Sequence, residues 1–206
     1  LYMRAMEQAG PEKVAKAAWE KNGVKVLVGP LSGDEGLAVK DYAKTKPDVT
    51  IVNGTSAAQD TTLRDPAPNF FRFSTDGAQW MAGLGDYAYN TKNYKKVATL
   101  AEDYSFPYTQ VFGFMAPFCK AGGHVVKKFW VPIGTKDFSS VIAAMPDNID
   151  AIYVVLGGAD SVNFLTQYQQ AGGQAPLVGG SVTVDQTILG SKGKIHDVAI
   201  GTPSAG

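Results

Sequence analysis

The sequence predicts an α/β fold in which helices cover parallel strands. Short apolar runs rich in β-branched residues alternate with segments of helical periodicity along the chain of 206 residues, which is typical of consecutive strand–helix–strand units. The longest apolar run, 151–158, contains no charged residue, as expected for a strand buried on both faces. We expect strands, in chain order, at 24–28, 49–52, 69–73, 96–100, 124–131, 151–156, 177–179 and 198–201.

Helices are expected in the intervals between these strands. The clearest opens at Asp137 and ends before Pro146, with apolar residues at the spacing i, i+3, i+4 and i+7 that places them on one buried face. Two further segments have similar spacing and are interpreted as covering helices. The apolar positions of the three segments are Val14, Ala17 and Ala18; Trp80, Met81, Leu84 and Ala88; and Phe138, Val141, Ile142 and Met145.

The start of the chain departs from this alternation. Residues 1–10 suit an amphipathic helix, yet Pro11 begins another helix at once, since proline is favoured in a first helical turn. A strand should separate two helices in an α/β fold, so we expect a segment to be absent between Gly10 and Pro11.

Composition excludes several classes of partner. Nineteen basic and nineteen acidic residues leave no net charge to attract nucleic acid. The longest apolar run is far shorter than the roughly 20 residues of a membrane helix, so no membrane insertion is expected. No signal peptide is visible in the first residues. Cys119 is the only cysteine, which excludes an intrachain disulfide and leaves the compartment open.

Residues that would support catalysis, metal binding or nucleotide binding are few. His124 and His196 lack cysteine or carboxylate partners at ligand spacing and are interpreted as structural or surface residues. Cys119 follows Phe118 in a segment rich in aromatic residues, so we expect a buried, inert thiol. No glycine cluster fits a nucleotide loop. The sequence therefore predicts no catalytic residue, no metal ligand and no cofactor, and indicates a protein that is not an enzyme.

Three loops follow the carboxyl ends of predicted strands, where open α/β sheets bind ligands. Residues 29–36 (GPLSGDEG) and 53–58 (NGTSAA) each lead into a helix whose free N–H groups can hold a carboxylate. An alternative is that Ser32 and Ser56 only cap helices. Residues 102–108 (EDYSFPY) place three aromatic residues in a polar loop, which favours one wall of a small-molecule site, with core packing of one or two rings as the alternative.

The order of these loops resembles that of the branched-chain amino acid (Leu/Ile/Val)-binding family of periplasmic solute-binding proteins of ABC transporters. The resemblance implies the type I periplasmic-binding-protein fold, with two Rossmann-like lobes and a ligand cleft between them. It assigns 1–74 to an incomplete first lobe, 75–201 to a second lobe, and 202–206 to a crossing back toward the first. The matching stretches are 22–24 (NGV), 28–33 (VGPLSG), 69–72 (NFFR), 102–104 (EDY), 136–140 (KDFSS) and 180–181 (GS).

The resemblance also implies a function. In that family the lobes close on a small-molecule ligand, and the closed form docks on the membrane permease of an ABC transporter. The location implied is periplasmic or otherwise extracytoplasmic. Family members are longer, so we expect segments to be missing before Leu1, between Gly10 and Pro11, and after Gly206.

Carried over by this resemblance, ligand contacts fall on both lobes. In the first lobe Gly33 stands where the family usually has serine, and Ala57 where it has threonine. In the second lobe Phe106 occupies the position of the aromatic residue that closes over the ligand, with Tyr108 near it. The predicted ligand-binding residues are Leu31, Ser32, Gly33, Ser56, Ala57, Tyr104, Phe106, Gly158, Ala159, Ser181 and Thr183.

One departure from the family pattern bears on the ligand. Ser181 stands at about the position of the acidic residue that receives the α-ammonium of an amino acid. Burying an ammonium group without a carboxylate costs several kcal/mol, so the sequence favours an aromatic or other organic carboxylate, or an amide. The alternatives are binding of a branched-chain or other amino acid, and a cytoplasmic ligand-sensing regulator of the same fold. A secretion signal upstream of Leu1 would separate the transport receptor from the regulator.

Overall fold

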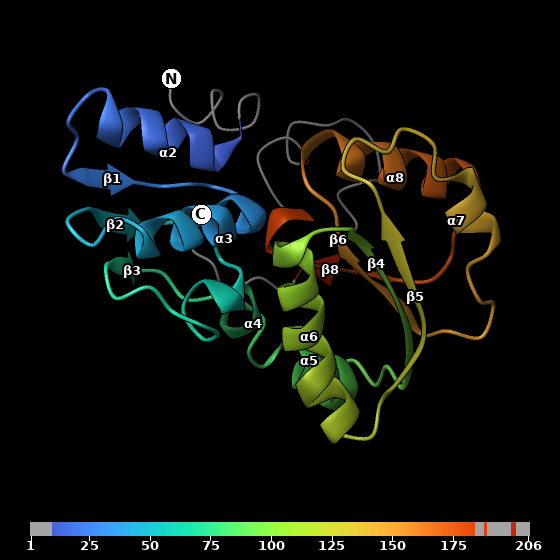
Figure 1. Cartoon of the computed structure of the whole chain (residues 1–206). Coiled ribbons are helices and arrows are strands. Elements are labelled where there is room, and N and C mark those ends of the chain that lie inside the picture. The colour runs from blue at the N-terminus through green and yellow to red at the C-terminus, as the bar shows by residue number, and fades with distance from the viewer. Residues whose placement is uncertain (1–9, 184–187, 189–198, 201–206) are drawn as a thin grey trace. The chain divides into compact units, whose positions relative to one another are not determined.

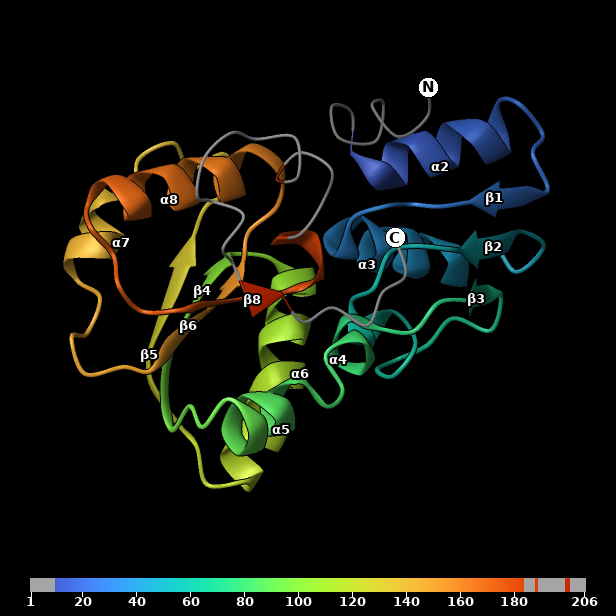
Figure 2. The same cartoon turned by 180° about the vertical axis from the view of Figure 1, so that it is seen from behind.

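The structure of the chain is a computed structural model that describes residues 10–183, 188 and 199–200. The chain divides into two compact units: a first unit of Leu1–Gly77 with Tyr104–Thr109, and a second unit of Ala78–Asp103 with Gln110–Gly206. Each unit holds one parallel sheet (Figures 1 and 2), so the predicted α/β class is confirmed. The division into lobes at residue 74 stays a prediction, and the crossing expected at 202–206 lies outside the described residues.

Within its described residues, the first unit has three parallel strands in the order β1-β2-β3. Its elements are α2 (Pro11–Glu20), β1 (Val26–Val28), α3 (Gly33–Lys44), β2 (Thr50–Asn53), η1 (Gln59–Thr61) and β3 (Phe70–Arg72). Ile51 of β2 is fully buried and packs with Phe70 of β3 and Val39 of α3 in one apolar core. On α2 the buried residues are Ala15 and Ala18, while Val14 and Ala17 are half-buried, so the predicted face is rotated by about one position.

In the part of the second unit that the structure describes, five parallel strands have the order β5-β4-β6-β7-β8. Its strands are β4 (Lys96–Glu102), β5 (His124–Val131), β6 (Ala151–Val155), β7 (Leu177–Gly179) and β8 (Ala199–Ile200). Its other elements are α4 (Gly77–Trp80), α5 (Leu84–Asp86), η2 (Tyr87–Thr91), α6 (Ser105–Lys120), α7 (Ser139–Ala143), α8 (Gly158–Gln170) and η3 (Ser181–Thr183), of which α4 and α6 begin in the first unit. All eight strands therefore lie where the sequence predicts them, with small differences at the ends.

Helices cover both faces of the second sheet, α5 and α6 on one side and α7 and α8 on the other (Figures 1 and 2). Successive residues of β6 explain why. Tyr153 packs with Phe114 and Phe118 of α6, whereas Ile152 and Val154 pack with Phe164 of α8. This alternation is the period of two expected of a strand buried on both faces.

Two predicted helices are shorter than the sequence pattern indicates. Met81, Leu84 and Ala88 are buried as predicted, but the single helix expected there is wrong: Gly83 has a left-handed φ of 86° and separates α4 from α5 and η2. The helix expected from Asp137 spans only the five residues of α7. Its apolar face is confirmed, with Phe138 fully buried in the α7–α8 core.

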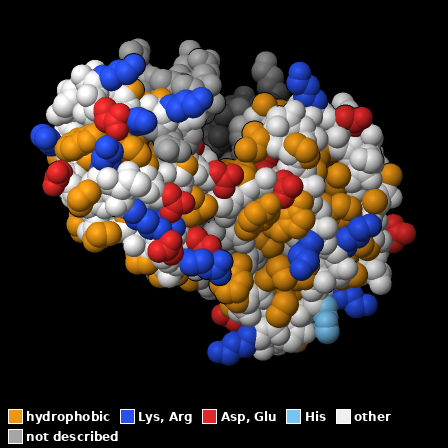
Figure 3. All heavy atoms as spheres, viewed as in Figure 1, with side chains coloured by type: hydrophobic (Ala, Val, Ile, Leu, Met, Phe, Trp, Pro, Cys, Tyr) orange, Lys and Arg blue, Asp and Glu red, His pale blue; other side chains and the backbone are white. Residues whose placement is uncertain are grey.

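The prediction of a buried thiol at Cys119 is wrong, because Cys119 is exposed. Helix α6 is apolar on both sides, so hydrophobicity alone does not tell which side is buried. Phe114 and Phe118 are fully buried, whereas Phe112 is 57% exposed. Hydrophobic side chains also gather on the surface of the second unit in the view of Figure 3.

The described residues contain neither a metal-ligand cluster nor a membrane helix. No group of three or more histidine, cysteine, aspartate and glutamate residues in this part of the chain is placed to hold a metal ion. None of the described helices is long and apolar enough to cross a bilayer. His124 is exposed at the start of β5, and His196 lies outside the described residues.

Candidate functional site

In the first unit, the loop from β1 to α3 is fixed by its own helix cap. Ser32 is the N-cap of α3 and forms a capping box with Glu35, whose carboxylate accepts the Ser32 backbone N–H at 3.2 Å. The alternative interpretation of Ser32 as a cap is therefore confirmed. A cap does not exclude ligand contact, because the other N–H groups of the first turn remain available to an anion.

The neighbours of Ser32 differ in exposure. Leu31 is 53% exposed, while Gly33 is buried. A Cβ atom at position 33 would lie 2.5 Å from Ser105 Oγ and 3.0 Å from the Phe106 nitrogen. The close approach of the 104–109 segment therefore leaves no room for a side chain at position 33.

In the loop after β2, an asparagine closes the turn on both sides. Asn53 Oδ1 accepts the backbone N–H of Ser56 at 3.0 Å, and Asn53 Nδ2 donates to the carbonyl of Ser56 at 2.7 Å. The Ser56 side chain is fully buried against Gly36 of α3. Ala58, not Ser56, is the N-cap of η1, so the cap interpretation of Ser56 is wrong. Ala57 is also buried, and its carbonyl accepts the N–H of Gly77 at 2.9 Å.

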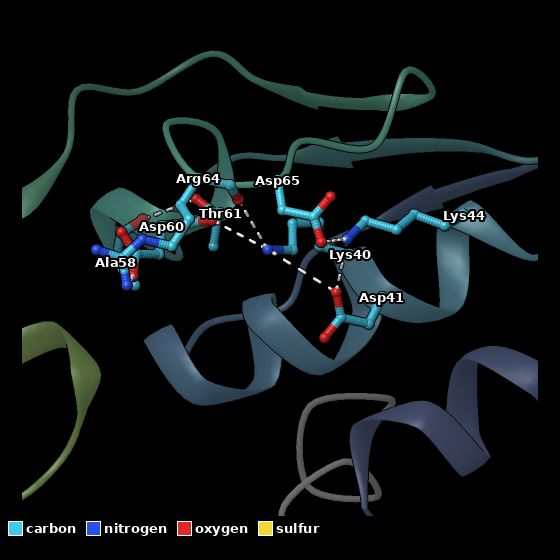
Figure 4. Close-up of polar contacts among 8 residues, drawn as sticks. All are labelled: Lys40, Asp41, Lys44, Ala58, Asp60, Thr61, Arg64 and Asp65. Atoms are coloured by element: carbon cyan, nitrogen blue, oxygen red, sulfur yellow. Dashed lines mark hydrogen bonds and ion pairs between the residues drawn. The ribbon is translucent and has the colours of Figure 1, made fainter.

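A buried lysine anchors the segment that continues this loop (Figure 4). Lys40 Nζ donates to the carbonyls of Asp60 at 3.1 Å and Arg64 at 3.2 Å. Only 7% of its side chain is exposed. Residues 53–65 are thus attached to α3 by a charged donor from within the unit.

In the second unit, three strand ends meet at one edge of the sheet. Glu102 ends β4, Gly157 follows β6, and Ser181 follows β7. The Gly157 N–H donates to Glu102 Oε1 at 3.0 Å. These residues form the carboxyl edge of the second unit, which is where ligands bind in open parallel sheets.

Gln110 of α6 fixes the loop after β7. Its Oε1 accepts the backbone N–H of Ser181 at 3.1 Å, and its Nε2 donates to the Ser181 hydroxyl oxygen. Tyr153 donates to the Gln110 carbonyl at 3.4 Å. Gly180 leaves room for this amide, since a Cβ there would lie 2.7 Å from Gln110 Oε1. Gln110 therefore determines how Ser181 is presented.

The other predicted residues of this edge have different surroundings. The Thr183 hydroxyl donates to the carbonyl of Val154 at 2.7 Å and accepts the N–H of Leu156 at 3.2 Å, and its side chain is buried. Gly158, with φ 49°, and the exposed Ala159 form the first turn of α8. A ligand contact of Thr183 would thus compete with two backbone bonds.

Residues 102–108 do not form the polar loop that the sequence predicts. Helix α6 begins at Ser105, because Pro107 is tolerated in a first helical turn, so most of this stretch is helical. Tyr104 is half-buried with its ring centroid 6.3 Å from that of Phe106, which is only 6% exposed. Tyr108 is 45% exposed.

Glu102 is the carboxylate of this edge, and its environment is unusual. It is 5% exposed, and burial raises its pKa above the usual range, against the hydrogen bond from Gly157, which lowers it. The negative charge of Asp160 raises the pKa further. Among the described residues, no lysine or arginine lowers the pKa of Glu102.

Sequence reasoning assigned no role to Glu102 or Gln110. A signal for Gln110 was present, because Gln110, Phe114 and Phe118 have the spacing i, i+4 and i+8 of one helix face. A polar residue within an apolar stripe indicates a buried hydrogen-bonding role. Glu102 carries no such signal, since its neighbours come from distant strands.

Two parallel sheets with loops at their carboxyl edges are typical of the bilobal class of α/β binding proteins. Comparison with known sequences agrees with this class. Residues 6–205 match the Periplasmic binding protein family. The chain belongs to this family.

Individual relatives refine the comparison. A Leu/Ile/Val-binding protein homolog 6 from Brucella melitensis is 27% identical over 174 residues, which are 82% of this chain and 44% of that protein. A solute-binding protein of an ABC transporter from Rhodopseudomonas palustris BisB5, solved in complex with 3,4-dihydroxybenzoic acid, is 26% identical with a TM-score of 0.79. The comparison covers 91% of this chain and 52% of the chain of that protein.

A third relative is an ABC transporter substrate-binding protein from Sphaerobacter thermophilus, 30% identical with a TM-score of 0.75. The comparison covers 88% of this chain and 51% of that one. The chain thus spans about half the length of the relatives it matches.

Proposed function

We propose that this chain is part of the extracytoplasmic substrate-binding component of an ABC transporter, and that it binds a small organic carboxylate by closure of two lobes. An aromatic acid is the favoured ligand. Membership of the periplasmic binding protein family supports the class of function. The partners are the small-molecule ligand and the membrane permease, and we expect no catalytic turnover.

The observation that carries the choice of ligand is the loop after β7. Ser181, at about the position where amino-acid binders of the resembling family have an acid, is neutral and hydrogen-bonded to Gln110. A buried ammonium group requires a full set of acceptors and a countercharge. The complex of the 26% identical relative with 3,4-dihydroxybenzoic acid supports an aromatic acid.

The carboxylate of the ligand fits the first unit better than the second. In the first unit, the N-terminus of α3 offers backbone N–H groups and a positive dipole end. In the second, Glu102 would repel an anion. We therefore propose Leu31, Ser32, Gly33, Ser56 and Ala57 as the residues around the carboxylate. The residues proposed for the rest of the ligand are Tyr104, Phe106, Gly158, Ala159, Ser181 and Thr183.

A thermal-shift screen of the full-length protein tests this proposal. Benzoate and 3,4-dihydroxybenzoate should raise the melting temperature more than leucine, isoleucine or acetamide, because a ligand at 100 times its Kd stabilises the folded state by about 2.7 kcal/mol. The name of the Brucella relative favours a branched-chain amino acid as the alternative. Stabilisation by leucine or isoleucine alone would establish that alternative.

A further inference from the structure

We propose that Glu102 is a ligand-facing acceptor that selects aromatic acids bearing a hydroxyl group remote from their carboxylate. This inference rests on the proposed function and names the substrate class of the same site. It stands on the placement of one buried carboxylate at the carboxyl edge of the second unit.

The position of Glu102 is set by the sheet. It ends β4, which lies between β5 and β6. The pairing of Ala101 with Val155 brings it beside the turn into α8. A Cβ at Gly157 would lie 3.7 Å from Glu102 Oε1, 4.0 Å from Oε2 and 3.9 Å from the Cβ of Val182. The carboxylate is therefore surrounded by the ends of β4, β6 and β7.

The hydrogen bonds of Glu102 are incomplete. Oε1 accepts from Gly157, while Oε2 has no hydrogen-bond partner among the residues that the structure describes. The charged groups that act on Glu102 include Asp160, which is itself buried and accepts the N–H of Gly134 at 2.7 Å. A buried carboxylate without a countercharge is costly unless a donor satisfies it, and such groups gather at functional sites.

The chemistry of the free oxygen favours a hydroxyl donor over an ammonium. A phenolic hydroxyl offers one proton, which matches one free carboxylate oxygen. An ammonium offers three protons, whereas the neighbouring hydroxyl oxygens already accept one hydrogen bond each: Ser181 Oγ from Gln110 and Thr183 Oγ from the Leu156 N–H. A hydroxylated aromatic acid thus fits this edge better than an amino acid.

Isothermal titration calorimetry of the full-length protein tests the inference with four ligands: benzoate, 4-fluorobenzoate, 4-hydroxybenzoate and leucine. The hydroxylated acid should bind about tenfold more tightly than the two acids that lack a donor, since a hydrogen bond to a charged group is among the stronger kinds. This comparison needs no variant, so it holds even if substitutions at 102 impair folding.

Variants at position 102 test whether Glu102 accepts the hydrogen bond of the ligand hydroxyl. Glu102→Gln keeps an acceptor for Gly157 and should lose most of the tenfold preference, while Glu102→Ala should lose all of it. The preference is measured within each variant as the ratio of the Kd for benzoate to the Kd for 4-hydroxybenzoate. Asp103→Asn, an exposed neighbour with the same change of charge, is the matched control and should keep the preference.

Four outcomes contradict the inference in distinguishable ways. Equal binding of benzoate and 4-hydroxybenzoate overturns it while leaving the proposed function intact. An equal loss of both ligands in Glu102→Gln assigns Glu102 to positioning Gly157 and α8. Tight leucine binding that Glu102→Gln abolishes overturns the hydroxyl class. Absence of binding by every aromatic acid refutes the proposed function itself.

Discussion

Gly180 should be intolerant of any side chain, because it lies against the amide that holds Ser181. In Gly180→Ala the new Cβ would lie 2.7 Å from Gln110 Oε1, 3.0 Å from Val155 Cγ2 and 3.2 Å from Tyr153 Oη. The backbone cannot retreat easily, since the Gly180 N–H donates to the carbonyl of Val154 at 2.7 Å. The amide of Gln110 must move instead.

The cost follows from two contributions. Overpacking of a tight core site costs about 1–3 kcal/mol. Displacement of the Gln110 amide also weakens its two hydrogen bonds to Ser181, each worth about 1 kcal/mol. We therefore expect Gly180→Ala to lower the free energy of unfolding by about 2–4 kcal/mol.

Urea denaturation followed by circular dichroism measures this loss. Gly54→Ala is the control, since no atom lies within 4 Å of its Cβ position. Combining Gly180→Ala with Gln110→Ala should lose less stability than the sum of the two single losses, because the second substitution removes the group that collides. A neutral Gly180→Ala, or strictly additive effects in the double variant, would refute the reasoning.

Three further substitutions test the cores and the edge carboxylate. Phe114→Ala should lower the free energy of unfolding in urea by about 3–5 kcal/mol, because Phe114 is fully buried and its ring centroid lies 4.2 Å from that of Tyr153. Phe112→Ala is the control and should change it little, because Phe112 is 57% exposed. Lys40→Met should cost about 1.5–3 kcal/mol by removing the charged donor to two carbonyls. Lys44→Met is the control and should cost much less, because Lys44 forms ion pairs with the exposed Asp41 and Asp65. The raised pKa of Glu102 means that the folded state binds this proton more tightly than the unfolded chain does, so its contribution to stability is present below pH 4.5 and is lost as pH rises through the folded pKa. Thermal melts of Glu102→Gln against the wild type should show its relative stability rising with pH above 4.5; a pH-independent difference would contradict this.

The sequence predicted the sheets well because a strand buried on both faces is marked locally. The strands at 124–131 and 177–179 have the predicted bounds. The clearest local signal is that of β6, whose five residues are consecutive apolar residues and are all buried. Helices were predicted less well. The spacing of Met81, Leu84 and Ala88 identifies a buried face correctly, but a left-handed glycine at 83 divides the helix without changing that spacing.

The loops of the first unit illustrate a second limit. Hydroxyl residues after a strand fit either a ligand or a cap, and both Ser32 and Ser56 were open to either interpretation. Ser32 caps α3, whereas Ser56 is not the N-cap of η1, and its side chain is directed at Gly36. The difference depends on how α3 packs beside β2, which no local pattern contains.

The candidate edge of the second unit depends wholly on contacts between distant residues. Glu102 and Gly157 are separated by 55 positions, and Gln110 and Ser181 by 71. Each residue alone is ordinary: a glutamate at the end of a strand, a glutamine within a helix, a glycine before another helix. The parallel register of β4 with β6 and of β6 with β7 brings them together. The placement of the Glu102 carboxylate beside Gly157 is therefore decided by register, because a shift of one residue along β4 would turn Glu102 to the other face of the sheet.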